Sequence, residues 1–524
     1  MSKAKSKPAK VQAPVDLDGI DPKAYARRWW TLGALCLTLL GVMLANSSLN
    51  MALPLMATDL TLDQLEITWV VNVYTLVFAS LLFMAGAVGD RYGRKLAMQI
   101  GLAIFTAGSL YAGILAQTGT ELIIARVVMG LGGALVMPTT LSIINNTFPK
   151  SERARAVAIW SAVAGIGMMI GSVVSGVLLE HFSWHSLFYF SAIIAIVGLV
   201  ANHVLAHESR DEEETPVDWL GGSLAALGIF GIVYGVTEAP SNGVLDPGVL
   251  TSLIGGLVAI ALFVLWQLRT KTPTLDMKLF KNRAFSISSL TLTLTFLAMS
   301  GVFFSMSQLM QLILGFSALE SSLAMIPMMV PMMILSPFIP NVVHKFGARV
   351  TIAAGLFVTA VAFVAMTFWT KDMTYWHLLF TMLFMMLGIS AAMTPGTNIL
   401  MASVPRNRSG MGSAMNDTTR ELGGALGVAV LGAVLSAVYV KNIAETASQF
   451  TGAVKEGLES SLAVALQVAH ELGPMAESIT NASKVAWMDG LSTASMVAAV
   501  IIFACSIIAF FGLPKHQDKD SDIV

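Results

Sequence analysis

Three ionisable residues stand close together in a strongly apolar part of the chain. In the stretch MNDTTRELGG, Asp417 and Glu421 are four residues apart, and Arg420 lies between them. On a helix this spacing places the two carboxylates about 40° apart on one face, with the arginine close to both. Two carboxylates at this distance can hold a proton or a cation, so the cluster predicts proton exchange or cation binding.

A charge in the middle of a bilayer costs about 2.5–3.5 kcal/mol on insertion scales, so the cluster requires either a partner or water. Two interpretations are open. In the first, Arg420 forms a buried ion pair with Asp417 or Glu421 and locks neighbouring helices together. In the second, the carboxylates line a central cavity, with Asn416 beside them, and titrate as protons and substrate exchange.

The rest of the chain predicts an all-α polytopic membrane protein. Its 524 residues are 55% apolar and 12% charged, with a mean hydropathy of +0.73, whereas soluble domains carry about 25% charged residues. Apolar runs long enough to cross a ~30 Å hydrocarbon core recur along the sequence. We place 14 transmembrane helices at 30–52, 66–88, 96–116, 121–145, 154–179, 186–206, 218–238, 248–268, 285–311, 321–343, 350–369, 376–400, 410–438 and 487–513.

Lysine and arginine are unequally divided between the two sides that these spans define. With both termini in the cytosol, 25 of the 31 fall on the cytosolic side and four fall outside. This is a strong positive-inside pattern. The sequence therefore predicts a multi-pass protein of the cytoplasmic (inner) membrane with both termini cytosolic.

The two halves of the sequence resemble each other. PKSERARAVAIWSAVAGIGMMIG aligns with PRNRSGMGSAMNDTTRELGGALG at a constant offset, and DRYGRK has a weaker counterpart in HKFGAR. Internal repeats of this kind build alternating-access transporters, with the substrate site between the halves. We therefore divide the chain into a cytosolic tail (1–28), a six-helix bundle (29–206), an acidic linker with two inserted helices (207–284), a second six-helix bundle (285–513) with a long outside loop (439–486), and a cytosolic tail (514–524).

The connection between the second and third spans, GAVGDRYGRK, combines glycines with charges. Gly86 and Gly93 permit close helix approach and a tight turn, and Arg91 and Arg94 lie on the cytosolic side. From composition alone this is an ordinary positive-inside loop. With Asp90 it becomes a candidate gating element.

The full pattern of that loop resembles the GxxxDRxGRK signature of the major facilitator superfamily. NMALP, WVVNVY, ARVVMGLGGALVMP, FSWHSLF and MNDTTRELGGALGVAVLG, together with fourteen spans, are similar to its drug/proton antiporter branch, which includes the QacA-type multidrug exporters. The resemblance covers about residues 28 to 515. It implies a major facilitator fold in which Asp90 latches the halves together when the cytosolic side is closed, against the helix that begins near Gly410.

Two further motifs carry the resemblance. In the fifth span, Gly167, Gly171 and Gly176 match the glycines of the branch's antiporter motif, which implies a gating role, although Ser172 stands in its proline position. In the fourth span, the resemblance makes Arg126 a proton-coupling residue. The alternative is an arginine near a helix end that snorkels to the surface.

These observations predict a proton-coupled exporter that moves amphipathic, cationic drugs or biocides by alternating access. Proton coupling is expected from Asp417, Glu421, Arg420 and Arg126, and position in the spans suggests substrate contacts from Asp417, Glu421, Asn416, Asn50, Trp160, Tyr234 and Gln308.

The expected partners are small amphipathic substrates, protons and the lipid bilayer, without nucleic acid, and the chain is expected to act as a monomer. We expect no cofactor and no metal, and the sequence has no motif of a nucleotide-hydrolysing or nucleophilic enzyme. One alternative is export of a neutral or zwitterionic antibiotic or metabolite, because Ala45 stands where the branch commonly has an acid. Another is a non-transporting receptor or scaffold.

Overall fold

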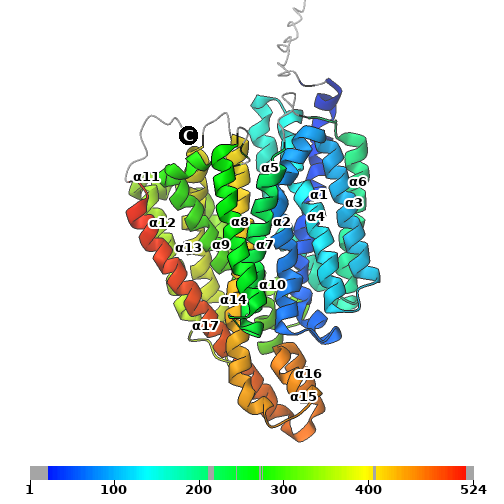
Figure 1. The fold of residues 1–524 in the computed structure, drawn as a ribbon, viewed down its shortest axis with the longest axis vertical. Helices are drawn as coiled ribbons and strands as arrows, with labels where there is room; N and C mark the ends of the chain where they lie inside the picture. The colour runs from blue at the N-terminus through cyan, green and yellow to red at the C-terminus, as the bar shows by residue number, and fades with distance from the viewer. Residues whose placement is uncertain are drawn as a thin grey trace, which may run out of the picture.

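The computed structural model describes residues 20, 22–210, 217–243, 245–270, 273, 275–404 and 409–514. Within these ranges the chain is helical, with no strand. The long helices run side by side along the long axis of the molecule, and the start of α1 and the end of α17 lie at the same end, here called the proximal end (Figure 1). Most of the predicted N-terminal tail, part of the acidic linker and nearly all of the C-terminal tail lie outside the described residues.

The first half of the chain contains six long helices, and two more follow them. They are α1 (Pro22–Asp59), α2 (Gln64–Tyr92), α3 (Arg94–Ile114), α4 (Gly119–Thr147), α5 (Lys150–His181), α6 (His185–Leu205), α7 (Trp219–Asn242) and α8 (Pro247–Arg269).

The second half alternates long helices with short ones. They are η1 (Met277–Lys281), α9 (Arg283–Gln308), η2 (Leu309–Ile313), α10 (Ala318–Leu335), η3 (Ser336–Phe338), α11 (Ile339–Phe346), α12 (Ala348–Met366), α13 (Tyr375–Ala402), α14 (Ser409–Ala447), α15 (Ala453–Ser460), α16 (Leu462–Glu471), η5 (Gly473–Met475) and α17 (Ala476–Gly512).

Twelve helices of the described chain are long and apolar enough to cross a membrane, so this is a polytopic membrane protein. In α5 and α10, shorter apolar stretches occur at 170–181 and 318–332, and the count of fourteen spans stays a prediction. The span predicted at 321–343 is wrong as one helix. It is divided by η3 because η3 and α11 each carry a proline at their start, which removes a backbone donor.

Side chains and glycines fix several helix ends. At the start of α2, the Glu66 amide donates to Asp63 Oδ1 at 2.6 Å and the Asp63 amide donates to Glu66 Oε2 at 3.2 Å, which forms a reciprocal capping box. Gly93 and Gly347 have φ values of +122° and +83°, a conformation that favours glycine. These glycines stand in DRYGRK and HKFGAR, so the sequence repeat recurs in the backbone.

Buried apolar side chains form two main clusters. The first runs mostly through α1 to α6 and includes Leu39, Phe105 and Met129. The second runs through α9 to α17 and includes Phe363 and Trp487. The chain therefore folds into two packed helical bodies, one from each half of the sequence.

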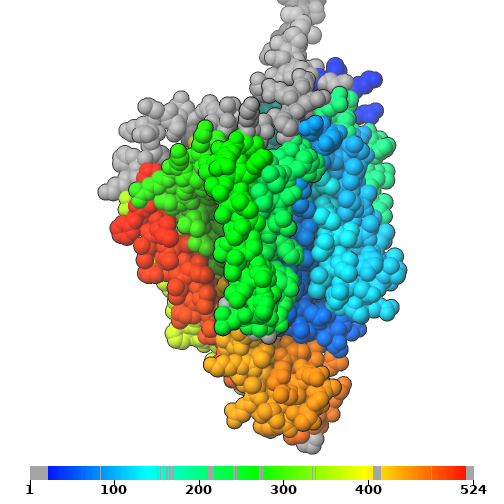
Figure 2. Space-filling model, in the orientation of Figure 1, coloured from blue at the N-terminus to red at the C-terminus, as the bar shows by residue number. Residues whose placement is uncertain are grey.

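The α7–α8 pair lies over the junction between α2 and α14, across the middle of the face in Figure 2. Trp69 Nε1 of α2 donates to Glu238 Oε1 of α7 at 2.8 Å, and its ring lies 5.6 Å from that of Tyr234. At the other end of the pair, Trp266 Nε1 of α8 donates to Asp218 Oδ1 at 2.8 Å. Hydrogen bonds thus connect α7 and α8 to each other and connect α7 to α2 of the first half of the chain.

The region 439–486, predicted as a long, partly helical outside loop, is mostly helical in the structure. The helices α14 and α17 extend past their neighbours, and α15 and α16 pack between them as a cap at the distal end, opposite the chain ends (Figure 1). Tyr439 Oη donates to the Leu458 carbonyl at 2.8 Å, and Ser461 Oγ donates to the Leu62 carbonyl at 3.1 Å. The cap therefore belongs to the second half and rests on the first.

Candidate functional site

Glu421 of α14 lies near the contact of the two halves, where it interacts with Tyr74 of α2, and Asp417 stands one helical turn before it. Helix α14 packs closely on α9 here. A Cβ on Gly423 would meet the carbonyl oxygen of Thr293, and a Cβ on Gly427 would meet that of Leu297. On another side, a Cβ on Gly424 would lie 3.8 Å from Thr75 of α2. The glycines thus let α14 approach α9 within its own half and α2 of the other half, beside Asp417 and Glu421.

No ion pair among the described residues includes Arg420. Its guanidinium lies 5.3 Å from the ring centre of Phe296 and interacts electrostatically with both Asp417 and Glu421. Asn416 precedes Asp417 in the chain, and its side chain interacts with the Asp417 carboxylate. Both carboxylates are partly buried. The first interpretation, a closed ion pair, is therefore absent from this conformation, and the carboxylates keep capacity for a proton or a cation.

Arg126 is fully buried on α4, so it does not snorkel to the surface. Its Nε donates to the Val70 carbonyl of α2 at 3.1 Å, and its guanidinium lies 4.3 Å from the ring centre of Tyr74. The other two guanidinium nitrogens have no hydrogen-bond partner among the described residues. Burial of this cation is supported mainly by the tyrosine ring.

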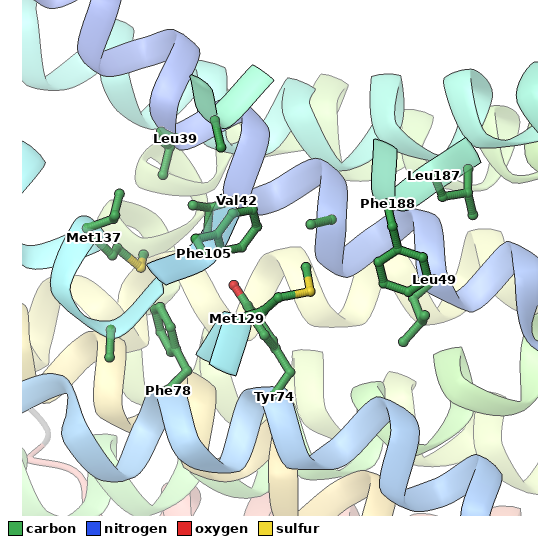
Figure 3. Close-up of a cluster of buried hydrophobic side chains, with 14 of the residues drawn as sticks. Leu39, Val42, Leu49, Tyr74, Phe78, Phe105, Met129, Met137, Leu187 and Phe188 are labelled. Atoms are coloured by element: carbon green, nitrogen blue, oxygen red, sulfur yellow. The ribbon is translucent and has the colours of Figure 1, made fainter. Parts of the chain in front are cut away.

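Tyr74 is a residue that the sequence did not single out. It reaches from α2 towards Met129 inside the first apolar cluster (Figure 3), and its buried hydroxyl has no hydrogen-bond partner. Tyr74 interacts electrostatically with Arg126 and with Glu421 of the other half. Its position one helical turn after Val70 places it beside Arg126, but only the structure reveals that the Val70 carbonyl accepts from Arg126.

The other predicted substrate contacts lie apart from one another. Asn50 Oδ1 on α1 and Gln308 Nε2 at the end of α9 are buried polar atoms without partners. Trp160 is buried in the first cluster, with Nε1 donating to Thr140 Oγ1 at 3.3 Å. Tyr234 packs on Trp69 at the α2–α7 contact. The structure therefore joins Asn416 to the α14 carboxylates and places Trp160 and Tyr234 in packing positions.

In the GAVGDRYGRK loop, Asp90 pairs with a residue of the same loop. Arg94 Nε donates to Asp90 Oδ1 at 2.7 Å, and the Arg91 guanidinium lies 5.7 Å from the ring of Tyr92. A Cβ on Gly86 would lie 3.6 Å from Pro138 of α4. Asp90 thus has a local partner in this conformation, and its latch role stays a prediction.

Glu208, at the start of the acidic linker, caps α3. Its carboxylate accepts from the Lys95 amide at 3.0 Å and the Leu96 amide at 3.1 Å, and the Arg94 amide donates to the Ser209 carbonyl at 2.9 Å. The contact satisfies backbone donors that a helix start leaves free. The acidic linker is thus attached to this loop at its first residues.

The three glycines of α5 allow close packing against two different helices, α1 and α10. A Cβ on Gly167 would lie 3.1 Å from Leu40, and one on Gly171 would meet Ser47 Oγ, so both seat α5 on α1. A Cβ on Gly176 would lie 2.7 Å from Leu319 Cα of α10, in the other half. Gln311 Nε2 also donates to the Met51 carbonyl at 2.9 Å. The halves are therefore joined at the distal end.

The geometry is that of a two-bundle membrane transporter, and the comparisons agree. Residues 35–428 match the model of the Major Facilitator Superfamily, so the chain belongs to this family. It is 33% identical over 486 residues to the multidrug efflux pump LfrA of Mycolicibacterium smegmatis, covering 92% of this chain and 95% of LfrA. It is 30% identical over 504 residues to the methyl viologen resistance protein SmvA of Salmonella typhimurium, covering 94% of this chain and 100% of SmvA.

A solved structure supports the same fold. A bacterial homolog of the human lysosomal transporter Spinster, in an inward-facing and occupied conformation, has a TM-score of 0.64 at 17% identity, covering 94% of this chain and 98% of that one. Fold and relatives together indicate a transporter rather than an enzyme, and the relatives include multidrug efflux pumps.

Proposed function

We propose that this protein exports amphipathic, cationic compounds in exchange for protons. The observation that carries the proposal is the pair Asp417 and Glu421, two carboxylates one turn apart on α14 that have no ion-pair partner among the described residues, with Glu421 near Tyr74 of the other half. The relatives add support, because LfrA is named a multidrug efflux pump and SmvA a methyl viologen resistance protein. Methyl viologen is a doubly charged aromatic cation, a class that buried carboxylates attract.

The mechanism follows from competition for the same negative charge. A cation from the cytosol binds at Asp417 and Glu421, and the halves then reorient. Protons from outside take its place on the carboxylates and displace it. Return to the first conformation releases the protons to the cytosol, while Arg420 favours the deprotonated acids and so assists that release. Arg126, which contacts the ring of Tyr74, would interact electrostatically through Tyr74 with the charge on Glu421 of the other half.

The proposed architecture has fourteen spans in the cytoplasmic membrane, with the proximal end in the cytosol and the distal cap outside. In it, α7 and α8 form an inserted hairpin between a bundle at 29–206 and a bundle at 285–513, and the protein works as a monomer. The positive-inside pattern supports this orientation. The cross-half contacts at the distal end support an inward-facing conformation.

Dye transport in everted membrane vesicles tests the proposal. An imposed proton gradient should drive accumulation in the wild type, and an uncoupler should collapse it. Asp417→Asn or Glu421→Gln should abolish the gradient-driven part, whereas Glu180→Gln, at an exposed carboxylate of α5, should not. Unchanged gradient-driven transport in both α14 variants would refute proton coupling at this pair. Competition by cations but not by neutral compounds would separate the proposal from export of a neutral or zwitterionic substrate.

A further inference from the structure

A line of polar residues follows α2 where it faces α14, and the transport cycle above does not use it. A Cβ on Gly432 of α14 would lie 3.4 Å from Thr68 Oγ1, and one on Gly424 would lie 3.8 Å from Thr75 Cγ2. These contacts show that this face of α2 lies against α14. Asn72 stands one helical turn from each threonine, on the same face.

The distal end of this seam holds a small polar cavity of about 10 Å³, close to the space that one water molecule needs. Its polar lining comes from Gln64 and Thr68 of α2, Thr237 of α7 and Ser436 of α14. Gln64 Nε2 is buried and has no partner. Helix α7 forms one wall of this cavity through Thr237, and it packs on both α2 and α14.

Asn72 has no exposed surface, and neither its Nδ2 nor its Oδ1 has a hydrogen-bond partner in the part of the chain that the structure describes. A buried amide without partners is strongly unfavourable, and ordered water is the usual way to satisfy one. Together, Gln64 and Asn72 place unsatisfied donors and acceptors along the seam, two helical turns apart. This arrangement fits a file of water better than an apolar helix contact.

On α14 the same face leads to the proposed coupling site. Glu421, Gly424, Val428 and Gly432 are spaced by three or four residues, so they share one side of the helix. Val428 lies between the glycines that contact Thr75 and Thr68, which places it at the level of Asn72. It is apolar, so it interrupts the polar line between Asn72 and Glu421.

We infer that the seam between α2 and α14 is a hydrated route by which protons from outside reach Glu421, with Gln64, Thr68 and Asn72 as its hydrogen-bonding groups and Val428 as its gate. The inference rests on the proposed function. A proton enters from external water, passes along hydrogen-bonded waters and ends on the Glu421 carboxylate as the cation leaves. Asn72 orients the waters and carries no proton itself.

Other ionisable groups flank this route. Glu66 at the start of α2 is held in the capping box. Glu238 of α7 accepts from Trp69 and from Asn242. Tyr74 faces α4, with Arg126 behind it. The two acids stand at the outside end, where negative charge attracts protons. Arg126 stands near the inner end beside Tyr74, and Arg420 and Asp417 act on Glu421 from α14 itself.

Proteoliposomes with the purified full-length protein test the route. Asn72→Val should slow gradient-driven transport about tenfold, the effect of a barrier raised by about 1.4 kcal/mol when the waters lose the group that orients them, and Asn72→Ser should restore most of the rate. Thr68→Val should slow transport in the same direction. Its control is Thr359→Val, because both threonines are buried and donate to the carbonyl four residues earlier. Val428→Asn should open a proton leak in the absence of substrate.

Equilibrium binding in detergent separates this inference from the proposed function. Low pH should still displace a bound cation from Asn72→Val, because Glu421 is intact. The route is wrong if Asn72→Val transports at the wild-type rate and Val428→Asn does not leak protons. The proposed function still stands in that case if Glu421→Gln abolishes displacement of the bound cation by protons. If Glu421→Gln transports normally, the proposed function fails first. If Asn72→Val and Asn72→Ser slow transport equally, a polar side chain at position 72 is not what the route requires, and the inference is wrong.

Discussion

Gly171 of α5 and Gly427 of α14 occupy equivalent places in the two halves, and each seats its helix on the first helix of its own bundle. A Cβ on Gly171 would meet Ser47 of α1, and a Cβ on Gly427 would meet the Leu297 carbonyl of α9. The repeat in the sequence is thus a repeat in packing. One of the two helices carries the carboxylates and the other does not, so the halves share a scaffold and differ in chemistry.

Gly427→Ala should lower the melting temperature of the purified protein, because the added methyl group collides with backbone that cannot rotate away. Overpacking of this kind costs about 1–3 kcal/mol. Gly255→Ala is the control, since nothing lies within 4 Å of the added Cβ on α8, and alanine favours a helix by about 1 kcal/mol over glycine. Equal melting temperatures for the two variants would contradict close packing of α14 on α9.

Tyr74→Phe should retain folding and keep Arg126 in place, because the ring stays and the lost hydroxyl has no partner. Tyr74→Leu should destabilise the protein, since a desolvated cation–π contact contributes about 2 kcal/mol. Thermal unfolding in detergent measures both effects. Similar losses from both variants would show that the hydroxyl, and not the ring, supports the buried arginine.

Glu208→Ala should loosen the start of α3, because it removes the acceptor for the Lys95 and Leu96 amides. The loss of a helix cap costs about 0.5–2 kcal/mol. Hydrogen exchange at the first turn of α3 should rise, while the exposed neighbour variant His207→Ala should leave it unchanged. No change in exchange for Glu208→Ala would mean that the linker does not hold this loop.

Much of the fold follows from composition and spacing. The span predicted at 186–206 is α6 (His185–Leu205), and the span predicted at 121–145 lies within α4 (Gly119–Thr147). Long apolar runs with few charges form helices, because in a membrane the backbone must satisfy its hydrogen bonds within the segment. The sequence predicts residues 439–486 only as a partly helical loop, because the residues of the cap at 453–471 are moderately apolar and pack on parts of the chain remote in sequence.

The site was predictable only in its local parts. The position of Asp417 and Glu421 on one helix follows from a spacing of four, and the Asp90–Arg94 pair has the same spacing. The Arg126–Tyr74 contact joins two helices, and the Glu208 cap joins the linker to α3. The order of residues does not reveal which side chains on different helices lie close together. The sequence therefore predicts a role for Arg126 but not its contact with Tyr74.

The most direct test of the central claim is proton release on cation binding, measured with a pH indicator in weakly buffered detergent solution. If Asp417 and Glu421 bind either protons or the substrate, the wild type should acidify the solution when a lipophilic cation binds near neutral pH. Asp417→Asn and Glu421→Gln should each release fewer protons per cation bound, while Glu180→Gln should match the wild type. Tight binding to the wild type with no proton release would contradict the account.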